Sequence, residues 1–285
     1  MSGAHAPGFD AAPSHAGRRG RPDLSREPVT ALVLTQNSVG IIGRCVRSLS
    51  WADEVLVVDG GSVDETVSVA AALGARVLVN LWPGFAAQWR FGLDHAGHDW
   101  VLVCASDEEV PPALAAEVET VLARVRDDAG VAGFRVPRRN QFLGAWMDVG
   151  PWARDEGLRL FRRQAARVTE SAVHEGFEVD GTVATLSSPL HHYAHPTLSE
   201  SIQRLNRYTT LEAHDRAGRR RIRALDPLVS PAGVFFKYYI AKGCWRAGVR
   251  GYLLASITAM YKSVLYVKIR SLQSQPRASG GDVHG

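Results

Sequence analysis

Cysteine is scarce in this sequence, and its placement argues against a disulfide-stabilised protein. The 285 residues include three cysteines, Cys45, Cys104 and Cys244, which lie far apart and form no CxxC pair. This spacing favours a reduced compartment over a disulfide framework. We expect each cysteine to fill the core.

A long uncharged apolar run is also missing. In the apolar segment after Pro231, the longest such run covers residues 251–261, well short of the roughly 20 residues that a bilayer span requires. Residues 1–28 are rich in Gly, Ala, Pro and Arg and lack the apolar block of a signal peptide. We therefore expect a cytoplasmic protein whose C-terminal segment lies on the inner face of the plasma membrane without crossing it.

Positive charge is in modest excess and is unevenly distributed. The formal net charge is +4, and much of the excess lies between Arg204 and Arg270, which predicts an anionic partner there. No zinc finger, RRM signature or aromatic-basic RNA motif is present, so we expect no nucleic acid partner. A phosphorylated substrate or an anionic membrane surface is favoured instead.

Two patterns alternate along the first half of the chain, and 46% hydrophobic residues are enough for a substantial core. Continuous apolar runs predict strands that are buried on both faces, at residues 30–35, 54–59, 75–79 and 100–104. Helical spacing predicts helices that follow them, at residues 41–49, 64–73, 85–95 and 112–126. This alternation predicts an α/β fold with a parallel sheet and right-handed crossovers.

Polar residues follow three of these strands. In open α/β sheets ligands bind outside the carboxyl ends of the strands, so residues 35–37, 59–61 and 106–108 should converge on one nucleotide-sized crevice. Two capping boxes predict helix starts. One, at residues 62–65, should begin the second helix, and the other, at 197–200, should begin a helix that runs to about Arg216.

Eight stretches spread along the chain resemble those of one known family. They are TQNS at 35–38, WADEVLVVDGGSVDET at 51–66, GFAAQWRFGL at 84–93, DWVLVCASDEEV at 99–110, VPRRNQFLG at 136–144, DEGLRLFRR at 155–163, VHEGFEVDG at 173–181 and LNRYTTLEA at 205–213. Over about residues 29–270 the chain resembles the glycosyltransferase family 2 enzymes, and most closely the branch that includes the lipopolysaccharide core β-glucosyltransferases.

The resemblance implies the GT-A fold, a Rossmann-like, mostly parallel central sheet with flanking helices. We expect four parts along the chain: a disordered tail at 1–28, a nucleotide-sugar-binding and catalytic domain at 29–196, a helical, amphipathic and basic C-terminal extension at 197–272, and a second disordered tail at 273–285.

The resemblance also implies that Thr35, Asn37 and Asp59 hold the uridine end of a UDP-sugar. A carboxylate can accept hydrogen bonds from the uracil imide or the ribose hydroxyls, and a small neighbour such as Gly60 lets the ring approach. Ser106 belongs to the same predicted substrate site. Taken singly, Asn37 and Asp59 are more typical of residues that cap a turn; their joint position at strand ends favours donor binding.

Asp107 matches the last carboxylate of the family's D-x-D element, which resembles a divalent-metal ligand facing the sugar diphosphate. Mg²⁺ or Mn²⁺ would neutralise charge on the departing UDP. The first aspartate of that element is Ala105 here, and TQNS replaces the family's usual T-K-N-E. Magnesium is commonly held by one or two carboxylates together with phosphates and waters, so Asp107 can suffice. We expect Glu109 to lie in a solvated turn.

Asp155 matches the family's candidate catalytic base. An inverting transfer needs one base that takes the proton of the acceptor hydroxyl as its oxygen attacks the anomeric carbon. Glu156 is adjacent, and Glu175 is the second candidate. Three tryptophans, Trp82, Trp146 and Trp152, suit stacking on sugar rings and core packing equally well; Trp152 is the one placed in the predicted substrate site.

Histidines and arginines leave alternatives open. His191, His192 and His195 invite a zinc interpretation, but without a nearby cysteine or HExxH spacing we expect ordinary strand and loop histidines. Several arginines suit either phosphate or lipid headgroup binding or a solvated helical face. They are Arg204, Arg207, Arg219, Arg220, Arg221 and Arg223.

Three functions compete. The first is an inverting transferase that moves a hexose, glucose foremost, from a UDP-sugar to a hydroxyl of a glycan, a lipid-linked or a small-molecule acceptor. The second is a noncatalytic nucleotide-sugar or glycan binding protein, which Ala105, Gln36 and Ser38 favour. The third is a nucleotidyltransferase, for which TQNSVGIIGR is a poor phosphate loop.

Overall fold

The computed structural model describes residues 26–125, 130–169, 176–195, 197–218, 222–223 and 225–274. The two predicted tails therefore lie almost wholly outside the described residues. Arg26, near the end of the first predicted tail, is buried and pairs with Asp53 (Nη1 to Oδ2, 2.7 Å). This ion pair fixes the chain directly before the first strand.

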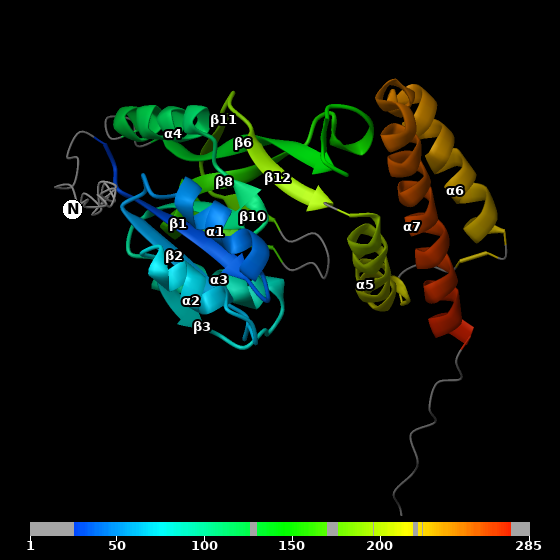
Figure 1. Cartoon of the computed structure of the whole chain (residues 1–285), viewed down its shortest axis with the longest axis horizontal. Coiled ribbons are helices and arrows are strands. Elements are labelled where there is room, and N and C mark those ends of the chain that lie inside the picture. Colours follow the sequence, from blue (N-terminus) through cyan, green and yellow to red (C-terminus); the bar gives the residue numbers. More distant parts are fainter. Residues whose placement is uncertain are drawn as a thin grey trace, which may run out of the picture.

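A large mixed sheet forms the centre of the molecule, with strands in the order β3-β2-β1-β4-β8-β6-β12-β5 (Figure 1). The first four are parallel, as predicted, whereas β8 runs antiparallel to both β4 and β6. β7 and β11 also pair with β6, and β9 and β10 form a separate two-stranded sheet. The strands are β1 Val29–Thr35, β2 Glu54–Asp59, β3 Arg76–Val79, β4 Trp100–Ala105, β5 Glu108–Glu109, β6 Val131–Phe142, β7 Ala145–Met147, β8 Glu156–Arg162, β9 Ala166–Val168, β10 Phe177–Val179, β11 Thr182–Thr185 and β12 Leu190–His195.

Helices cover both faces of the sheet because its central strands are apolar on both sides. One face packs against α1, α2 and α4, the last through Leu114, Val118 and Leu122. The opposite face packs against α3, through Trp89 and Leu93, and against β9 and β10. The helices of this half are α1 Val39–Ser48, α2 Thr66–Ala72, α3 Phe85–His95 and α4 Pro112–Arg124, with short helical turns η1 Gly150–Trp152 and η2 Arg163–Ala165.

Two local predictions are wrong. The third strand, Arg76–Val79, is not buried on both faces, because it is the last strand at its edge of the described sheet. The capping box at residues 62–65 does not form either. Helix α2 begins at Thr66 with no side-chain cap, and the Ser62 hydroxyl donates instead to the carboxylate of Asp59, which is a stronger acceptor than a backbone group.

Three α-helices follow β12 and lie together beside the sheet (Figure 1). Helix α5 starts and ends as predicted, and its cap residue Thr197 accepts the N–H of Glu200 (3.1 Å). Among the described residues, no helix combines the length and hydropathy that crossing a bilayer demands. These elements are α5 Leu198–Arg216, α6 Asp226–Phe236, η3 Lys237–Ala241, η4 Cys244–Ala247 and α7 Gly248–Ser274.

The C-terminal helices dock on the sheet through a small apolar cluster. Cys244 and Leu254 pack there with Phe142 and Met147. Gly251 is required at this contact, because a Cβ atom would lie 1.7 Å from the carbonyl oxygen of Cys244. All three cysteines are buried and free, as predicted.

Candidate active site

The register of neighbouring strands brings three strand ends together. Thr35 lies beside Asp59 in the β1–β2 pairing, and Leu34 lies beside Ala105 in the β1–β4 pairing. The hydroxyl oxygens of Ser38 and Ser106, 3.1 Å apart, join the ends of β1 and β4. The residues that follow these strands therefore share one edge of the sheet, as their sequence positions predict.

The turn after β2 is closed by its own hydrogen bonds. Asp59 is 1% exposed, and its carboxylate accepts the N–H groups of Gly61 (2.9 Å) and Ser62 (2.7 Å). Asn37, at a φ of +49°, accepts the N–H of Val63 through Oδ1 (2.9 Å). Both side chains thus cap turns. Because the Ser62 hydroxyl also donates to Oδ1, about one of the roughly four acceptor positions of Asp59 stays open. We call this group, with Thr35 and Gly60, the β1–β2 edge.

Thr35 and Gly60 give the β1–β2 edge two features that the turn itself does not require. Thr35 is 3% exposed, and its hydroxyl has no hydrogen-bond partner among the described residues. A buried polar group of this kind costs about 1–3 kcal/mol. At Gly60 a Cβ atom would lie 2.9 Å from Cε3 of Trp82. The glycine therefore lets the indole lie directly against the strand end.

Asp107 stands just beyond β4, beside a histidine and an arginine side chain. Its carboxylate, 14% exposed, lies 3.5 Å from Nε2 of His192 and 3.3 Å from Nη2 of Arg204. Burial raises the pKa of Asp107, but His192 and Arg204 outweigh burial and hold that pKa well below its ordinary value. The carboxylate is therefore ionised at neutral pH.

Glu108 is the second of three acidic residues that follow β4, and its role is structural. Its side chain is 0% exposed and accepts hydrogen bonds from the N–H of Ala105 (2.8 Å), Arg138 (3.3 Å) and Arg159 (2.9 Å). It is thus a buried structural carboxylate that closes the end of β4 at Ala105. The solvated turn predicted for Glu109 is wrong, because Glu109 pairs in β5 and accepts a hydrogen bond from the Tyr193 hydroxyl.

A line of hydrogen bonds connects Asp107 with Asp155. Nδ2 of Asn140 donates to Oδ2 of Asp155 (2.8 Å), so its Oδ1 faces Nδ1 of His192 (2.6 Å). Because that oxygen can only accept, Nδ1 of His192 carries a proton. Nε2 is then the nitrogen that faces Asp107. We call Asp107, Asn140, Asp155, His192 and Arg204 the Asp107 cluster.

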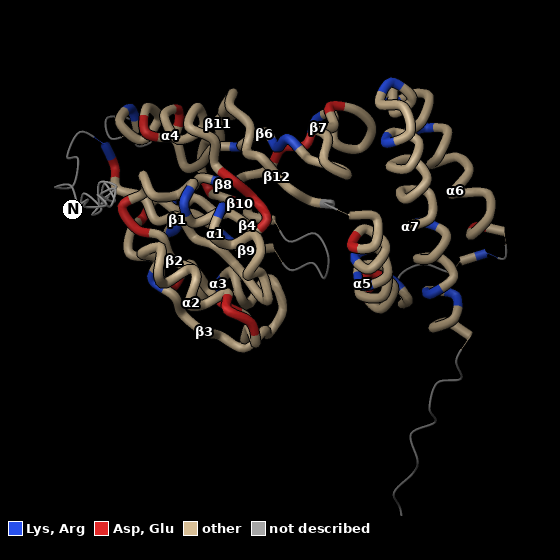
Figure 2. The backbone as a smooth tube through the Cα atoms, in the orientation of Figure 1, with Lys and Arg blue, Asp and Glu red and all other residues tan. Residues whose placement is uncertain are grey.

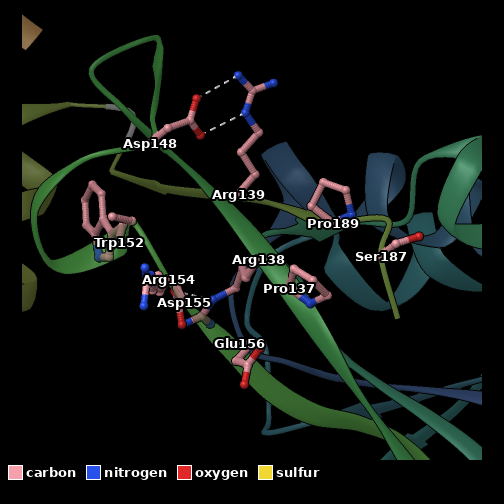
Figure 3. A pocket seen from close by; sticks show the side chains of 11 residues that line it. Pro137, Arg138, Arg139, Asp148, Trp152, Arg154, Asp155, Glu156, Ser187 and Pro189 are labelled. Carbon is pink, nitrogen blue, oxygen red and sulfur yellow. Dashed lines mark hydrogen bonds and ion pairs between the residues drawn. The ribbon is translucent and has the colours of Figure 1, made fainter. Parts of the chain in front are cut away.

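Asp155 is held by two donors at the margin of an open hollow of about 620 Å³. Nε of Arg138 donates to the same Oδ2 that Asn140 contacts (2.8 Å). Burial raises the pKa of Asp155, but Arg138 first and Asn140 second lower it below its ordinary value. Trp152 and Arg154 line the same hollow (Figure 3). Asp155 is therefore an oriented, ionised carboxylate beside a space that a substrate can enter.

The other predicted site residues lie apart from this cluster or outside the described residues. Glu175 lies outside the described residues, as do the three arginines at 219–221. Trp146 packs on the rings of His191 and Tyr193, and Trp82 contacts Phe85 edge to face. The part of the chain that the structure describes holds no group of three or more Cys, His, Asp and Glu side chains suited to a metal.

Sequence reasoning did not single out the residues that link the cluster. His192 was expected to be an ordinary histidine, and neither Arg138 nor Asn140 was proposed for a role. Asn140 and His192 lie side by side in the β6–β12 pairing, which no local pattern reveals. One signal was present, because Arg138 and Asn140 both belong to the stretch VPRRNQFLG that carries the family resemblance.

Comparisons with known proteins decide the family. The model described as "Glycosyl transferase family 2" matches residues 30–178, more than half of the chain. The chain belongs to glycosyl transferase family 2. The resemblance found in the sequence is thereby confirmed, and the protein is a glycosyltransferase.

Relatives match along nearly the whole chain. The chain is 28% identical over 272 residues to the lipopolysaccharide core biosynthesis glycosyltransferase LpsC of Rhizobium meliloti. The aligned region covers 92% of this chain and 100% of LpsC. The chain is 27% identical over 280 residues to an uncharacterized glycosyltransferase of Rickettsia bellii, covering 92% and 93% of the two chains.

A solved structure confirms the predicted fold class. The mannosyltransferase PcManGT of Pyrobaculum calidifontis, solved in complex with GDP-Man and Mn²⁺, is 16% identical and superposes with a TM-score of 0.51. The match covers 93% of this chain and 90% of that one. At this identity the likeness concerns the fold alone, which is the GT-A arrangement of a central sheet with flanking helices.

Proposed function

We propose that this glycosyltransferase moves a hexose, glucose foremost, from a UDP-sugar to a hydroxyl group with inversion at the anomeric carbon. The Asp107 cluster carries the proposal. It places an ionised carboxylate at the carboxyl end of β4 and a second ionised carboxylate, Asp155, beside an open hollow, with Asn140 and His192 between them. The proposed transfer needs a carboxylate that would hold a cation at the leaving diphosphate and a second carboxylate that acts as the base at the acceptor hydroxyl.

The β1–β2 edge would hold the uridine. The unpaired, buried hydroxyl of Thr35 supports this role, since a ligand that bonded it would remove the cost of an unsatisfied group. Asp59 and Asn37 are already fixed by the turn, so they would meet the nucleotide without reordering. Ser106, just beyond β4, would contact the diphosphate, while Gly60 would let the Trp82 indole form one wall of the nucleotide site.

Asp107 and His192 would hold Mg²⁺ or Mn²⁺. The donor set fits, because a carboxylate oxygen and an imidazole nitrogen face one another 3.5 Å apart, and the hydrogen bond from Nδ1 to Asn140 leaves Nε2 to act as a ligand. Two protein ligands are enough when phosphates and waters complete the shell. A bound cation would neutralise charge that develops on the departing UDP.

Asp155 would be the catalytic base. Arg138 and Asn140 hold its Oδ2 and keep the group ionised, so it can take the proton of an acceptor hydroxyl as that oxygen attacks the anomeric carbon. Glu175 remains the second candidate. Comparing Asp155→Asn with Glu175→Gln separates them, since only the variant of the true base should lose turnover.

The acceptor would enter the hollow beside Asp155, where the indole of Trp152 offers an apolar surface for a sugar ring. LpsC is named for lipopolysaccharide core biosynthesis, and this supports a glycolipid of the cell envelope as the acceptor, with other glycans and small molecules as the alternatives.

The end at which α6 and α7 meet would lie on an anionic membrane. Large apolar side chains are exposed there beside exposed cations, and no acidic residue occurs between residues 227 and 274. In Figure 2 this end carries Lys and Arg without Asp or Glu. The residues are Phe236, Ile240, Trp245 and Val249, with Lys237, Lys242, Arg246 and Arg250.

Vesicle flotation tests the membrane contact. The protein should float with phosphatidylcholine vesicles that contain phosphatidylglycerol and less with pure phosphatidylcholine. Replacing Trp245 and Val249 by serine should abolish flotation, while Val183→Ser, an exposed valine on the sheet, should not. Undiminished flotation of the double variant would refute the contact.

Calorimetry with UDP, with and without Mn²⁺, tests the donor site, and hydrolysis of UDP-glucose tests catalysis. We expect UDP binding that Mn²⁺ strengthens, and slow hydrolysis that Asp155→Asn abolishes. Binding without turnover of any donor would instead favour a noncatalytic binding protein. No UDP binding under either condition would refute the proposal.

A further inference from the structure

Helix α5 of the C-terminal extension reaches the Asp107 cluster through one side chain. Arg204 directs its guanidinium at Oδ2 of Asp107, with Nη1 at 3.4 Å and Nη2 at 3.3 Å. These distances exceed the about 2.7–2.9 Å of a strong charge-assisted hydrogen bond, and the side chain is 33% exposed. The pair is therefore loose and open to exchange.

Arg204 and the proposed cation compete for the same oxygen. Oδ2 of Asp107 is the atom that both Arg204 and His192 approach. A divalent cation on that oxygen would stand within contact range of the guanidinium, and the two positive charges would repel each other. Arg204 would then need another anionic partner, and the diphosphate of a donor bound to that cation would supply one. A guanidinium suits this partner, because its planar array of donors matches phosphate oxygens.

The backbone of α5 is held in place independently of Arg204. Nζ of Lys268, on α7, donates to the carbonyl oxygen of Asn206 (2.8 Å) and to the hydroxyls of Thr209 (2.9 Å) and Thr210 (2.7 Å). One turn further, the Tyr261 hydroxyl donates to Glu212. Arg204 can therefore change partner by rotation of its side chain, without movement of the helix.

We propose that Arg204 exchanges partners on donor binding: it neutralises Asp107 in the empty site and binds the diphosphate oxygens once a divalent cation occupies that carboxylate. This rests on the proposed function, because it takes the donor to be a nucleoside diphosphate sugar. It assigns α5 to the donor site, so the sheet alone does not complete that site.

The exchange predicts effects of opposite sign from one substitution. Arg204→Gln removes the competitor, so Mn²⁺ alone should bind more tightly, by up to roughly fivefold for a partly exposed ion pair. The same change removes a diphosphate ligand, so UDP should bind roughly 10- to 100-fold more weakly at saturating Mn²⁺, as expected for loss of a hydrogen bond to a charged group. A merely structural role would weaken both.

Electron paramagnetic resonance of Mn²⁺ and calorimetry of UDP measure the two affinities on the full chain. The matched control is Arg207→Gln, which removes the same charge from an exposed position on the same helix and should alter neither affinity. Arg204→Lys keeps the charge but not the planar fork, so it should retain wild-type Mn²⁺ binding while weakening UDP binding.

Two failures can be told apart. If the wild type binds UDP with Mn²⁺ and Arg204→Gln weakens both affinities or changes neither, the exchange is refuted and the proposed function stands. If the wild type shows no Mn²⁺-dependent UDP binding, the proposed function fails and the exchange fails with it. Circular dichroism of each variant ensures that the affinities refer to folded protein.

Discussion

The β1–β2 edge and the Asp107 cluster lie at the same end of the sheet, yet they are built in different ways. At the β1–β2 edge, Asp59 and Asn37 find their partners within the two adjoining turns. In the Asp107 cluster, each partner comes from a different element: β6, the loop before β8, β12 and α5. The β1–β2 edge is complete when two neighbouring strands pair, whereas the Asp107 cluster requires the whole chain to fold.

This difference implies that the two regions respond differently to substitution. Substitutions at the β1–β2 edge should stay local, because its hydrogen bonds lie within two adjoining turns. Substitutions in the Asp107 cluster should spread, because Arg138 binds both Asp155 and Glu108, and Asn140 binds both Asp155 and His192. Substitutions in each region can therefore test whether the effects stay local or spread.

The largest effect is expected at Asp155. Asp155→Asn keeps the size of the side chain but removes the base, so turnover should fall on the order of 10²- to 10⁴-fold, while UDP affinity stays within about twofold. Steady-state kinetics and calorimetry measure the two quantities. Equal turnover by both proteins would remove Asp155 from the role of base.

Glu108 should dominate stability in this part of the molecule. Glu108→Ala leaves Arg138 and Arg159 without their shared buried partner, and breaking a buried ion pair from one side costs about 3–5 kcal/mol. Urea denaturation measures the loss in free energy of unfolding. Glu156→Ala, an exposed carboxylate on β8, should stay within about 0.5 kcal/mol, and a comparable loss there would contradict the assignment of Glu108.

The pH profile should respond to Arg138. Asp155 has a lowered pKa, so its ionised form persists down to that lowered value and is lost as the pH falls through it. Arg138→Gln removes the largest of the interactions that oppose burial and leaves Asn140 and His192, so the acid limb of kcat/KM should move to higher pH. Arg139→Gln, which frees the exposed Asp148 and removes a cation–π contact with Trp146 but leaves the donors of Asp155 in place, is the control. An unmoved limb in Arg138→Gln would contradict the role of Arg138.

The smallest effect is expected at Thr35, where one substitution should leave stability unchanged or raise it but lower UDP affinity. Thr35→Val removes a buried hydroxyl that has no partner among the described residues, so stability should be unchanged or rise by up to about 1–3 kcal/mol. UDP affinity should fall by roughly 3- to 10-fold, as loss of one hydrogen bond of about 1 kcal/mol requires. Unchanged affinity would place the hydroxyl outside the donor site.

The contrast between the β1–β2 edge and the Asp107 cluster also explains what the sequence could predict. The apolar runs that form β1, β2 and β4 and the polar residues after them are local patterns, so these strands, their parallel pairing and the β1–β2 edge could be predicted. The exposure of β3 could not be predicted, because it depends on which strand of the sheet lacks an outer neighbour. The partners of Asp107 could not either, since Asn140 and His192 meet only through the β6–β12 pairing.

Asp107→Asn tests the central claim most directly, because it removes the charge at the proposed cation site with little change in shape. The account predicts that Mn²⁺ no longer strengthens UDP binding in this variant and that sugar transfer falls with it, while circular dichroism shows that the variant is folded. Mn²⁺-dependent UDP binding and transfer at wild-type levels in Asp107→Asn would contradict it.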